Sequence, residues 1–336
     1  MPATPLTRIA DALLDRAVVP GYSKLGPALR RRWWPADPAP GSMAGKRVLV
    51  TGATSGIGTA IAEGLLDLGA TVHVLGRNRA KTDDLVARLT AENRGADVVA
   101  EVCDVGDLAA VRAWAADFTG RVDALHGLVH NAGALPPERS ETAQGHELTL
   151  AVHVLGPHLM TALLADTLVD GASAVVWMSS GGMYGAGLRD DDLEFTQGEY
   201  SGVRAYARTK RMQVVLAADW AQRLAGRRVG VYSTHPGWVA TDGVTASIPG
   251  FGKVMAPLLR TPRTARTPPS GWSPPGRRPG HRTSGTTARS GPPRWAGSAA
   301  RTRRRSAGSW LRWRRTPTSR AEPCCAAAAA RPPTRR

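Results

Sequence analysis

Cysteine is scarce in this chain of 336 residues, which holds only three. Cys324 and Cys325 lie together near the C-terminus, so Cys103 is the single cysteine in the rest of the sequence. A disulfide framework needs several paired cysteines, and a structural metal site needs a cluster of ligands at close spacing. We therefore expect neither disulfides nor a metal site, and the composition favours a reducing compartment such as the cytoplasm.

Long apolar runs are also lacking. No stretch reaches the ~18 apolar residues that a membrane-spanning helix needs, and no convincing secretion signal is present. Residues 1–44 combine a short amphipathic pattern around Leu13 with the basic and aromatic run 30–34. Basic residues beside tryptophans suit a membrane surface; a lead-in that packs on the next domain is the alternative. We expect a cytoplasmic protein, with weak peripheral membrane contact left open.

Acidic and large aliphatic residues almost vanish after residue 262. Residues 263–336 contain 18 Arg, no Lys and one acid, Glu322, so this tail carries the whole formal net charge of +17. Leu311 is its one leucine, and it has no Val, Ile, Met or Phe. Such a composition cannot bury enough apolar surface to form a core. The tail is expected to lie outside the folded domain.

Two interpretations of the tail compete. Arginines with interleaved tryptophans are typical of a disordered arm that binds nucleic acid or anionic lipid. The alternative is GC-rich DNA translated out of frame. Shifting GC-rich codons for residues 265–272 by one nucleotide can give Pro-Asp-Ala-Ala-Val-Trp-Leu, an ordinary domain sequence. We favour a frame change near residues 261–264 and do not expect nucleic acid to be a partner.

A glycine-rich loop stands between an apolar segment that predicts a buried strand and a pattern that predicts a helix, over residues 46–68. This is the context of a dinucleotide site. Gly52 permits the tight turn, Gly56 lets the backbone approach a pyrophosphate, and Gly58 allows close helix–strand packing. A simple βα connection is the alternative. The residues expected to line the pyrophosphate site are Gly52, Thr54, Ser55, Gly56, Ile57 and Gly58.

No acidic residue ends the next predicted strand, residues 71–75. A site for NAD usually carries one there, about 20 residues on, to bind the ribose hydroxyls. Arg77 follows this strand instead, and its guanidinium suits the 2′-phosphate of NADP. The sequence favours NADP(H) and leaves NAD(H) open. Simple solvation of a surface loop by Arg77 is the alternative.

Tyr206 and Lys210 stand four residues apart in a segment with a helical pattern. Side chains at this spacing lie on one face of a helix. A nearby ammonium stabilises a phenolate and lowers the pKa of the phenol. Tyr206 is therefore a candidate proton donor or acceptor near neutral pH. The spacing alone is weak, since such pairs also occur on solvated helix faces.

Four further segments complete a pattern that resembles the short-chain dehydrogenase/reductase family. They follow the third to sixth predicted strands, and they are Asp104-Val105, Asn131-Ala132-Gly133, Ser179-Ser180 and the Pro-Gly-Trp-Val-Ala-Thr of residues 236–241. Their order and spacings match the family from about Lys46 to Thr241. Within the family, residues 179–183, 206–216 and 235–238 are most similar to the orphan "member 12" type and its bacterial relatives, for which the resemblance implies no established substrate.

The resemblance implies a mechanism. Ser180 would hydrogen-bond the substrate oxygen, Tyr206 would give or take the hydroxyl proton, and Lys210 would lower the pKa of Tyr206 and hold the nicotinamide ribose. Hydride would pass between the nicotinamide and the carbonyl carbon. Beyond the glycine loop and Arg77, the implied cofactor-binding residues are Asp104, Val105, Asn131, Ala132, Gly133, Tyr206, Lys210, Pro236, Gly237 and Thr241.

Two positions and one inserted segment depart from the family pattern. His153 occupies the place of an Asn that supports a proton-relay water. It could serve in the relay itself, because imidazole titrates near neutral pH, or it could cap local backbone groups. His130 replaces the first Asn of a pair, which we expect to be a mild change because Asn131 remains. Residues 189–195 insert an acidic stretch that predicts a surface loop.

We expect a single α/β domain of the Rossmann type, residues 45–262, with a doubly wound parallel sheet. The expected strands are 46–51, 71–75, 97–102, 124–130, 173–179 and 228–233. Residues 243–259 would form an apolar lid, which suits a small apolar alcohol or carbonyl compound. The predicted function is an NADP(H)-dependent oxidoreductase that interconverts alcohol and carbonyl. The alternative is a catalytically impaired nucleotide-binding scaffold of the same fold, and an oligomer stays open.

Overall fold

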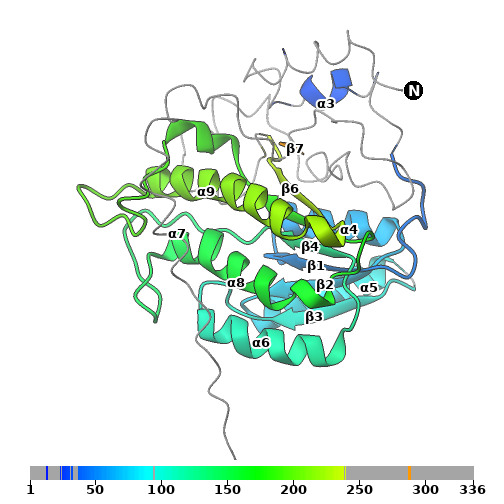
Figure 1. Cartoon of the computed structure of the whole chain (residues 1–336). Helices are drawn as coiled ribbons and strands as arrows, with labels where there is room; N and C mark the ends of the chain where they lie inside the picture. Colours follow the sequence, from blue (N-terminus) through cyan, green and yellow to red (C-terminus); the bar gives the residue numbers. More distant parts are fainter. Residues whose placement is uncertain are drawn as a thin grey trace, which may run out of the picture. The chain divides into compact units, whose positions relative to one another are not determined.

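The computed structural model describes residues 37–93, 95–237, 239 and 287–288, together with positions 13, 23, 25–30 and 32. These residues belong to the first of two compact units, Met1–Gly291. They form one sheet in the order β3-β2-β1-β4-β5-β6-β7 (Figure 1). The strands are β1 (Arg47–Thr51), β2 (Thr71–Gly76), β3 (Val98–Val102), β4 (Gly127–His130), β5 (Ala174–Met178), β6 (Gly230–Thr234) and β7 (Thr287–Ala288).

Helices connect the strands and cover both faces of the sheet (Figure 1). The α-helices are α3 (Leu25–Arg30), α4 (Gly56–Asp67), α5 (Arg79–Glu92), α6 (Leu108–Arg121), α7 (Leu148–Leu150), α8 (Gly156–Leu163) and α9 (Gly202–Arg223). A π-helical segment, η1 (Ala151–Leu155), joins α7 to α8, and the 3₁₀ segments are η2 (Ala165–Thr167), η3 (Gly181–Gly185) and η4 (Ala225–Arg227). Strands β1 to β6 are parallel. The predicted doubly wound fold is confirmed.

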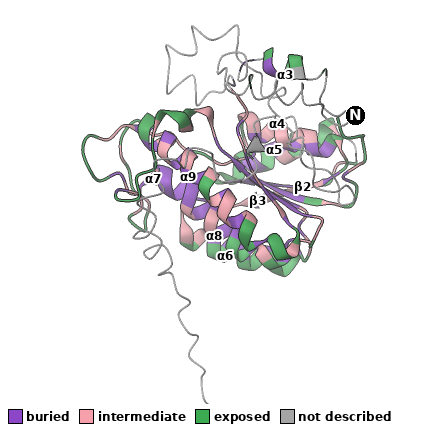
Figure 2. Ribbon diagram, turned by 45° about the horizontal axis from the view of Figure 1, so that its top comes forward, coloured by how far each residue is buried: buried purple, intermediate pink, exposed green. Residues whose placement is uncertain are grey.

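Alternating strand residues supply two hydrophobic cores, one on each face of the sheet. Leu49 and Leu128 pack with the residues of α6, α8 and α9, whereas Val48, Val50 and Val129 pack with those of α4 and α5. Successive side chains on a strand point to opposite faces, so a strand covered on both sides is apolar throughout. The strands β1, β2, β4 and β5 are accordingly mostly buried, whereas β3 and β6 are partly exposed. In Figure 2 the outward faces of the helices are exposed.

The order of the sheet reverses beside β1, which pairs with β2 on one side and with β4 on the other. At such a switch point the connections leave in opposite directions and open a crevice at the carboxyl ends of the strands. The segments that follow β1 and β4 therefore meet. The glycine loop after Thr51 and the Asn131–Gly133 turn belong to these two segments.

The start of β4 and the pairing of two tail residues with β6 differ from the expectation. Residues 124–126 were expected in a strand, but β4 begins at Gly127 because Leu125 pairs with Leu168 instead. The tail contributes β7, which runs antiparallel to β6 over two residues. The expected lid (243–259) lies outside the described residues. Among those described, no helix combines the length and the apolar character that crossing a bilayer requires.

Candidate active site

Two glycines of the loop after β1 are required by close backbone packing. Gly52 has φ +63°, and a Cβ there would lie 2.7 Å from the Cα of Ala132. A Cβ on Gly58 would lie 2.2 Å from the carbonyl oxygen of Gly52 and 2.6 Å from Nδ2 of Asn131. No larger residue fits either position without moving the main chain. The loop and the turn after β4 therefore form one closely packed cradle.

Hydrogen bonds join the same two segments. The Thr51 hydroxyl donates to the Val129 carbonyl (3.3 Å) and accepts from the backbone N–H groups of Asn131 (3.0 Å) and Ala132 (3.1 Å). The Asn131 amide donates to the carbonyls of Thr51 and Gly52, both at 3.1 Å. Thr51 was not singled out from the sequence; its place as the last strand residue before the glycine loop was the available signal. These bonds fix the shape of the cradle.

The first turn of α4 is suited to a phosphate group. Its N-cap, Ser55, makes no side-chain capping bond, whereas α5, α6 and α9 are capped by Asn78, Asp107 and Ser201. Uncapped N–H groups and the helix dipole together favour an anion. The residues of the cradle thus fit the pyrophosphate of a dinucleotide.

The end of β2 lies against the glycine loop. A Cβ on Gly76 would come within 2.6 Å of the Thr54 methyl group, so the two segments touch. Arg77 follows directly; it is exposed and has no ion pair within the described part of the chain. A guanidinium in this place can meet a phosphate on the adenosine ribose. The geometry is compatible with the predicted preference for NADP(H), which stays a prediction.

The remaining expected cofactor residues follow β3 and β6 at the same edge of the sheet. Asp104 is exposed, with its carboxylate accepting from the Gly106 N–H at 2.8 Å, and Val105 beside it is buried. Gly237, after Pro236, has φ +79°, and its N–H donates to Nδ1 of His235 at 3.2 Å. Thr241 lies outside the described residues.

Ser180, Tyr206 and Lys210 come together at the carboxyl end of β5. Ser180 caps η3 by accepting from the Gly182 N–H at 3.1 Å, and a Cβ added to Gly182 would lie 3.5 Å from the Ser180 hydroxyl and 3.6 Å from the ring of the half-buried Tyr206. The Lys210 Nζ lies 5.4 Å from the centre of the Tyr206 ring and donates to the Met178 carbonyl at 2.7 Å. A helix and a strand end thus place a hydroxyl, a phenol and an amine around one point.

The direction of the Tyr206 shift differs from the expectation. Burial raises the pKa of Tyr206, and the hydrogen bond to Ser180 only partly opposes that rise. Burial also lowers the pKa of Lys210 to about 7. The amine sits over the phenol ring and is hydrogen-bonded to Met178. The lowering of the Tyr206 pKa that the spacing predicts is therefore absent from the protein alone.

The Lys210 pKa gives a test by stability. Its folded value of about 7 lies below the ordinary 10.5, so the unfolded chain binds more protons between these two pH values. The free energy of unfolding should therefore rise with pH across that window, by at most about 1.4 kcal/mol per pH unit. Denaturant unfolding of wild type and Lys210→Met at several pH values checks this. An identical pH slope in the two proteins would contradict the assignment.

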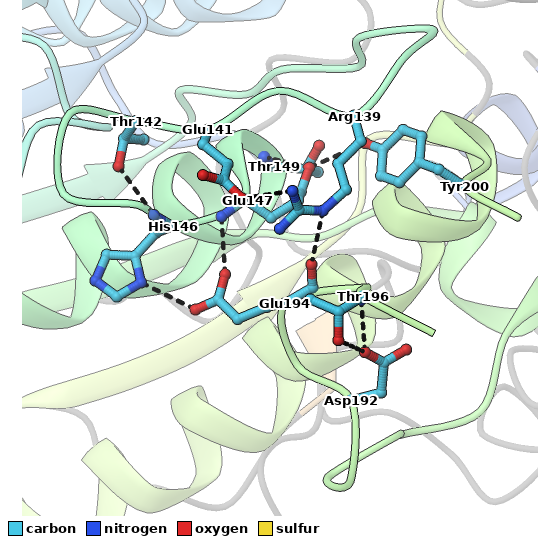
Figure 3. A network of polar contacts seen from close by, with 10 residues as sticks. All are labelled: Arg139, Glu141, Thr142, His146, Glu147, Thr149, Asp192, Glu194, Thr196 and Tyr200. Atoms are coloured by element: carbon cyan, nitrogen blue, oxygen red, sulfur yellow. Dashed lines mark hydrogen bonds and ion pairs between the residues drawn. The ribbon is translucent and has the colours of Figure 1, made fainter. Parts of the chain in front are cut away.

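The acidic insertion is more than a solvated loop, because it is tied to the segments around it (Figure 3). The Glu194 carboxylate accepts from Nδ1 of His146 (2.9 Å) and from the Glu147 N–H (2.8 Å). Asp192 is buried and forms an ion pair with Arg208 of α9 at 3.2 Å. Residues 189–191 are exposed, as expected of a surface loop, whereas Asp192 is not. The insertion therefore braces the start of the helix that carries Tyr206.

The fold and the site define a nucleotide-binding oxidoreductase, and comparison with known proteins gives its family. Residues 46–249 match the short chain dehydrogenase family model. Dehydrogenase/reductase SDR family member 12 of Homo sapiens is 33% identical over 65% of this chain and 68% of its own length. Retinol dehydrogenase 12 of Bos taurus is 34% identical over 65% of this chain and 69% of its own.

Solved structures agree. A short chain dehydrogenase from Burkholderia cenocepacia J2315 in complex with NADP has 25% identity and a TM-score of 0.54, covering 67% of this chain and 89% of its own. A blue fluorescent protein from a metagenomic library in complex with NADPH has 25% identity and a TM-score of 0.55, covering 66% and 87%. The chain belongs to the short-chain dehydrogenase/reductase family. It is an NAD(P)-dependent dehydrogenase or reductase that acts on a small molecule.

Proposed function

We propose that this protein is an NADP(H)-preferring oxidoreductase that interconverts an alcohol and a carbonyl group on a small apolar substrate. The meeting of Ser180, Tyr206 and Lys210 beside the glycine cradle carries this proposal. In the reduction, the Ser180 hydroxyl holds the substrate oxygen and Tyr206 donates the proton to it. Lys210 holds the nicotinamide ribose. When bound, the nicotinamide supplies the hydride.

The cofactor is held by four groups of residues in this proposal. The α4 N-terminus and the loop from Gly52 to Gly58 take the pyrophosphate. Arg77 takes the 2′-phosphate, and Asp104 with Val105 lies at the adenine. The nicotinamide half is assigned to the Asn131–Gly133 turn and to Pro236, Gly237 and Thr241. His153, the fourth expected catalytic residue, lies beside the Tyr206 ring.

Replacing Arg77 by alanine is expected to weaken NADPH binding about 10- to 100-fold, because one charge-assisted contact to a phosphate contributes about 1.5–3 kcal/mol. NADH binding should stay unchanged. Fluorescence titration with each cofactor measures both constants. Arg79→Ala is the matched control, since Arg79 is exposed on α5 and has only a 3.9 Å ion pair with Asp83. Equal loss for NADPH and NADH in Arg77→Ala would contradict the assignment.

A panel of carbonyl compounds offered with NADPH separates this function from its alternatives. Reduction of an aliphatic or aromatic ketone or aldehyde supports the oxidoreductase. Tight NADPH binding without turnover of any panel member would favour a nucleotide-binding scaffold. Steeply salt-dependent nucleic-acid binding that is lost on truncation after Pro262 would favour a role for the basic tail instead.

We further propose that residues 45–262 are the catalytic domain, that residues 1–44 are a lead-in, and that residues 263–336 are a tail read out of frame. The arginine excess and the near absence of aliphatic residues in the tail support this. We place the protein in the cytoplasm and leave open a contact of residues 1–44 with a membrane surface. Sequencing the locus tests the frame: an unbroken native frame through the tail would refute it.

A further inference from the structure

A buried imidazole links three segments of the site. The His153 side chain in η1 is fully buried. Its Nε2 accepts from the backbone N–H of Ala134, after β4, at 3.0 Å. Its Nδ1 lies 2.8 Å from the hydroxyl oxygen of Thr209, between Tyr206 and Lys210 on α9. Both ring nitrogens are therefore engaged within the protein.

These partners fix the protonation state of the ring. A backbone N–H can only donate, so Nε2 carries the lone pair. The Thr209 hydroxyl lies 3.0 Å from the carbonyls of both Ala205 and Tyr206, which take its single hydrogen, so it accepts from Nδ1–H. The imidazole is thus neutral and in one tautomer. A second proton on Nε2 would face the Ala134 N–H.

Burial and the neighbouring charge also favour the neutral form of the ring. The titratable groups that face it are Tyr206, whose ring meets the imidazole edge at 5.3 Å and 83°, and Lys210. Burial, aided by the Lys210 charge, holds the pKa of His153 well below its ordinary value of 6.5. An imidazole whose pKa is lowered in this way stays neutral near pH 7.

The main chain of His153 is also held by α9. In a regular α-helix its carbonyl would accept from the residue four further on, which is Pro157 and has no N–H. The helix is π-helical here, and the Gln213 side chain donates to the His153 carbonyl at 2.9 Å. Side chain and backbone of His153 therefore both bind the helix that carries the proposed catalytic phenol.

We propose that His153 is a positioning residue that holds Tyr206 and the turn after β4 in register, and that its ring neither takes up nor releases a proton during the reaction. The chain of bonds runs from the Ala134 N–H through the imidazole and the Thr209 hydroxyl to the Tyr206 carbonyl. Gly133 adjoins this chain, since a Cβ there would lie 3.0 Å from Nε2. The inference rests on the proposed function, because Tyr206 is the group that is positioned.

Three substitutions separate the two bonds of the ring. His153→Gln keeps an oxygen that reaches as far as Nε2, His153→Asn keeps a donor at the place of Nδ1, and His153→Leu keeps neither. We expect kcat for carbonyl reduction to fall about tenfold in the first two and up to about 100-fold in the third, as misplacement of a reacting group costs. Equal, wild-type kcat in all three would overturn the proposal.

Thr209→Val tests whether the hydroxyl belongs to the same unit. Valine keeps the shape but cannot accept from Nδ1, so kcat should fall, and His153→Leu/Thr209→Val should be no slower than His153→Leu alone. Fully additive losses would contradict the bond. The matched control is Thr161→Val. The Thr161 hydroxyl is hydrogen-bonded to another buried histidine, His130, at 2.7 Å. Thr161→Val should therefore lower the stability of the protein but not kcat.

The pH dependence distinguishes positioning from a relay. In the variants the limbs of the kcat–pH profile should keep their positions, and the ring nitrogen NMR signals of wild-type His153 should show Nδ1 protonated and Nε2 bare between about pH 5 and 8. Loss of a limb in His153→Gln, or titration of the ring in that range, would overturn the proposal. If wild-type protein binds NADPH but reduces no carbonyl compound, the proposed function is refuted. The NMR measurement still tests the protonation state proposed for the His153 ring.

Discussion

Replacing Tyr206 by phenylalanine is expected to lower kcat for carbonyl reduction by about 10²- to 10⁴-fold, the range that a positioned general acid contributes. The substitution removes one hydroxyl, which is the group proposed to donate the proton, and changes nothing else in the side chain. The ring remains, with its contacts to Lys210 and His153. NADPH binding should therefore persist. Steady-state kinetics and a fluorescence titration on the same preparation measure the two quantities.

Tyr200→Phe is the control for this prediction. The Tyr200 hydroxyl donates to the buried Glu147 at 2.9 Å, and burial raises the pKa of Tyr200 to about 12. Removing it should cost stability, of the order of 1 kcal/mol for one hydrogen bond, and leave kcat within about twofold of wild type, well short of the factor for a general acid. Undiminished turnover in Tyr206→Phe would refute the role of Tyr206 as the proton donor.

Replacing Gly156 by alanine is expected to lower the free energy of unfolding by about 3 kcal/mol, the upper end of the usual cost of overpacking. A Cβ at this position would lie 1.9 Å from the Val105 carbonyl oxygen and 2.8 Å from Val105 Cγ1. The helix would have to move away from the segment after β3. A domain of this size loses about 2–4 °C in Tm per kcal/mol, so thermal unfolding should show a drop of about 10 °C.

Gly120→Ala is the matched control, because Gly120 is helical in α6 and a Cβ there would meet nothing within 4 Å. Alanine is preferred to glycine in a helix by about 0.5–1 kcal/mol, so this variant should be as stable as wild type or more so. If Gly156→Ala and Gly120→Ala unfolded at the same temperature, the prediction that Gly156 is required by its tight packing on Val105 would be wrong.

Around the cradle, local sequence patterns were enough to predict the strand, the turn and the helix, but not where β4 begins. The strand, the glycine turn and the helix were predicted from residues 46–68, because an apolar run, helical periodicity and glycine act over short distances. The predicted start of β4 was three residues too early, because the local sequence does not reveal that Leu125 pairs with Leu168. The cofactor and catalytic assignments rest on family motifs and stay predictions until the variants are measured.

The insertion and the histidine show a different limit. Residues 189–195 are polar enough to predict a surface loop, yet Asp192 within them is buried against Arg208. His153 allowed two interpretations from the sequence, a relay or a backbone cap. In the structure the ring accepts from the backbone N–H of Ala134 and bonds Thr209, which lies 56 residues further along the chain, and these contacts support the proposed positioning role.

The sequence by itself determined the order of strands and helices, the place of the glycine-rich loop between β1 and α4, and the change of composition after residue 262. Each follows from local periodicity, turn chemistry or composition, which need no knowledge of distant neighbours. Only the tertiary structure decided the direction of the Tyr206 pKa, the tautomer of His153 and the need for glycine at position 156. These depend on burial and on which remote groups meet, and the short-range pattern of a chain carries neither.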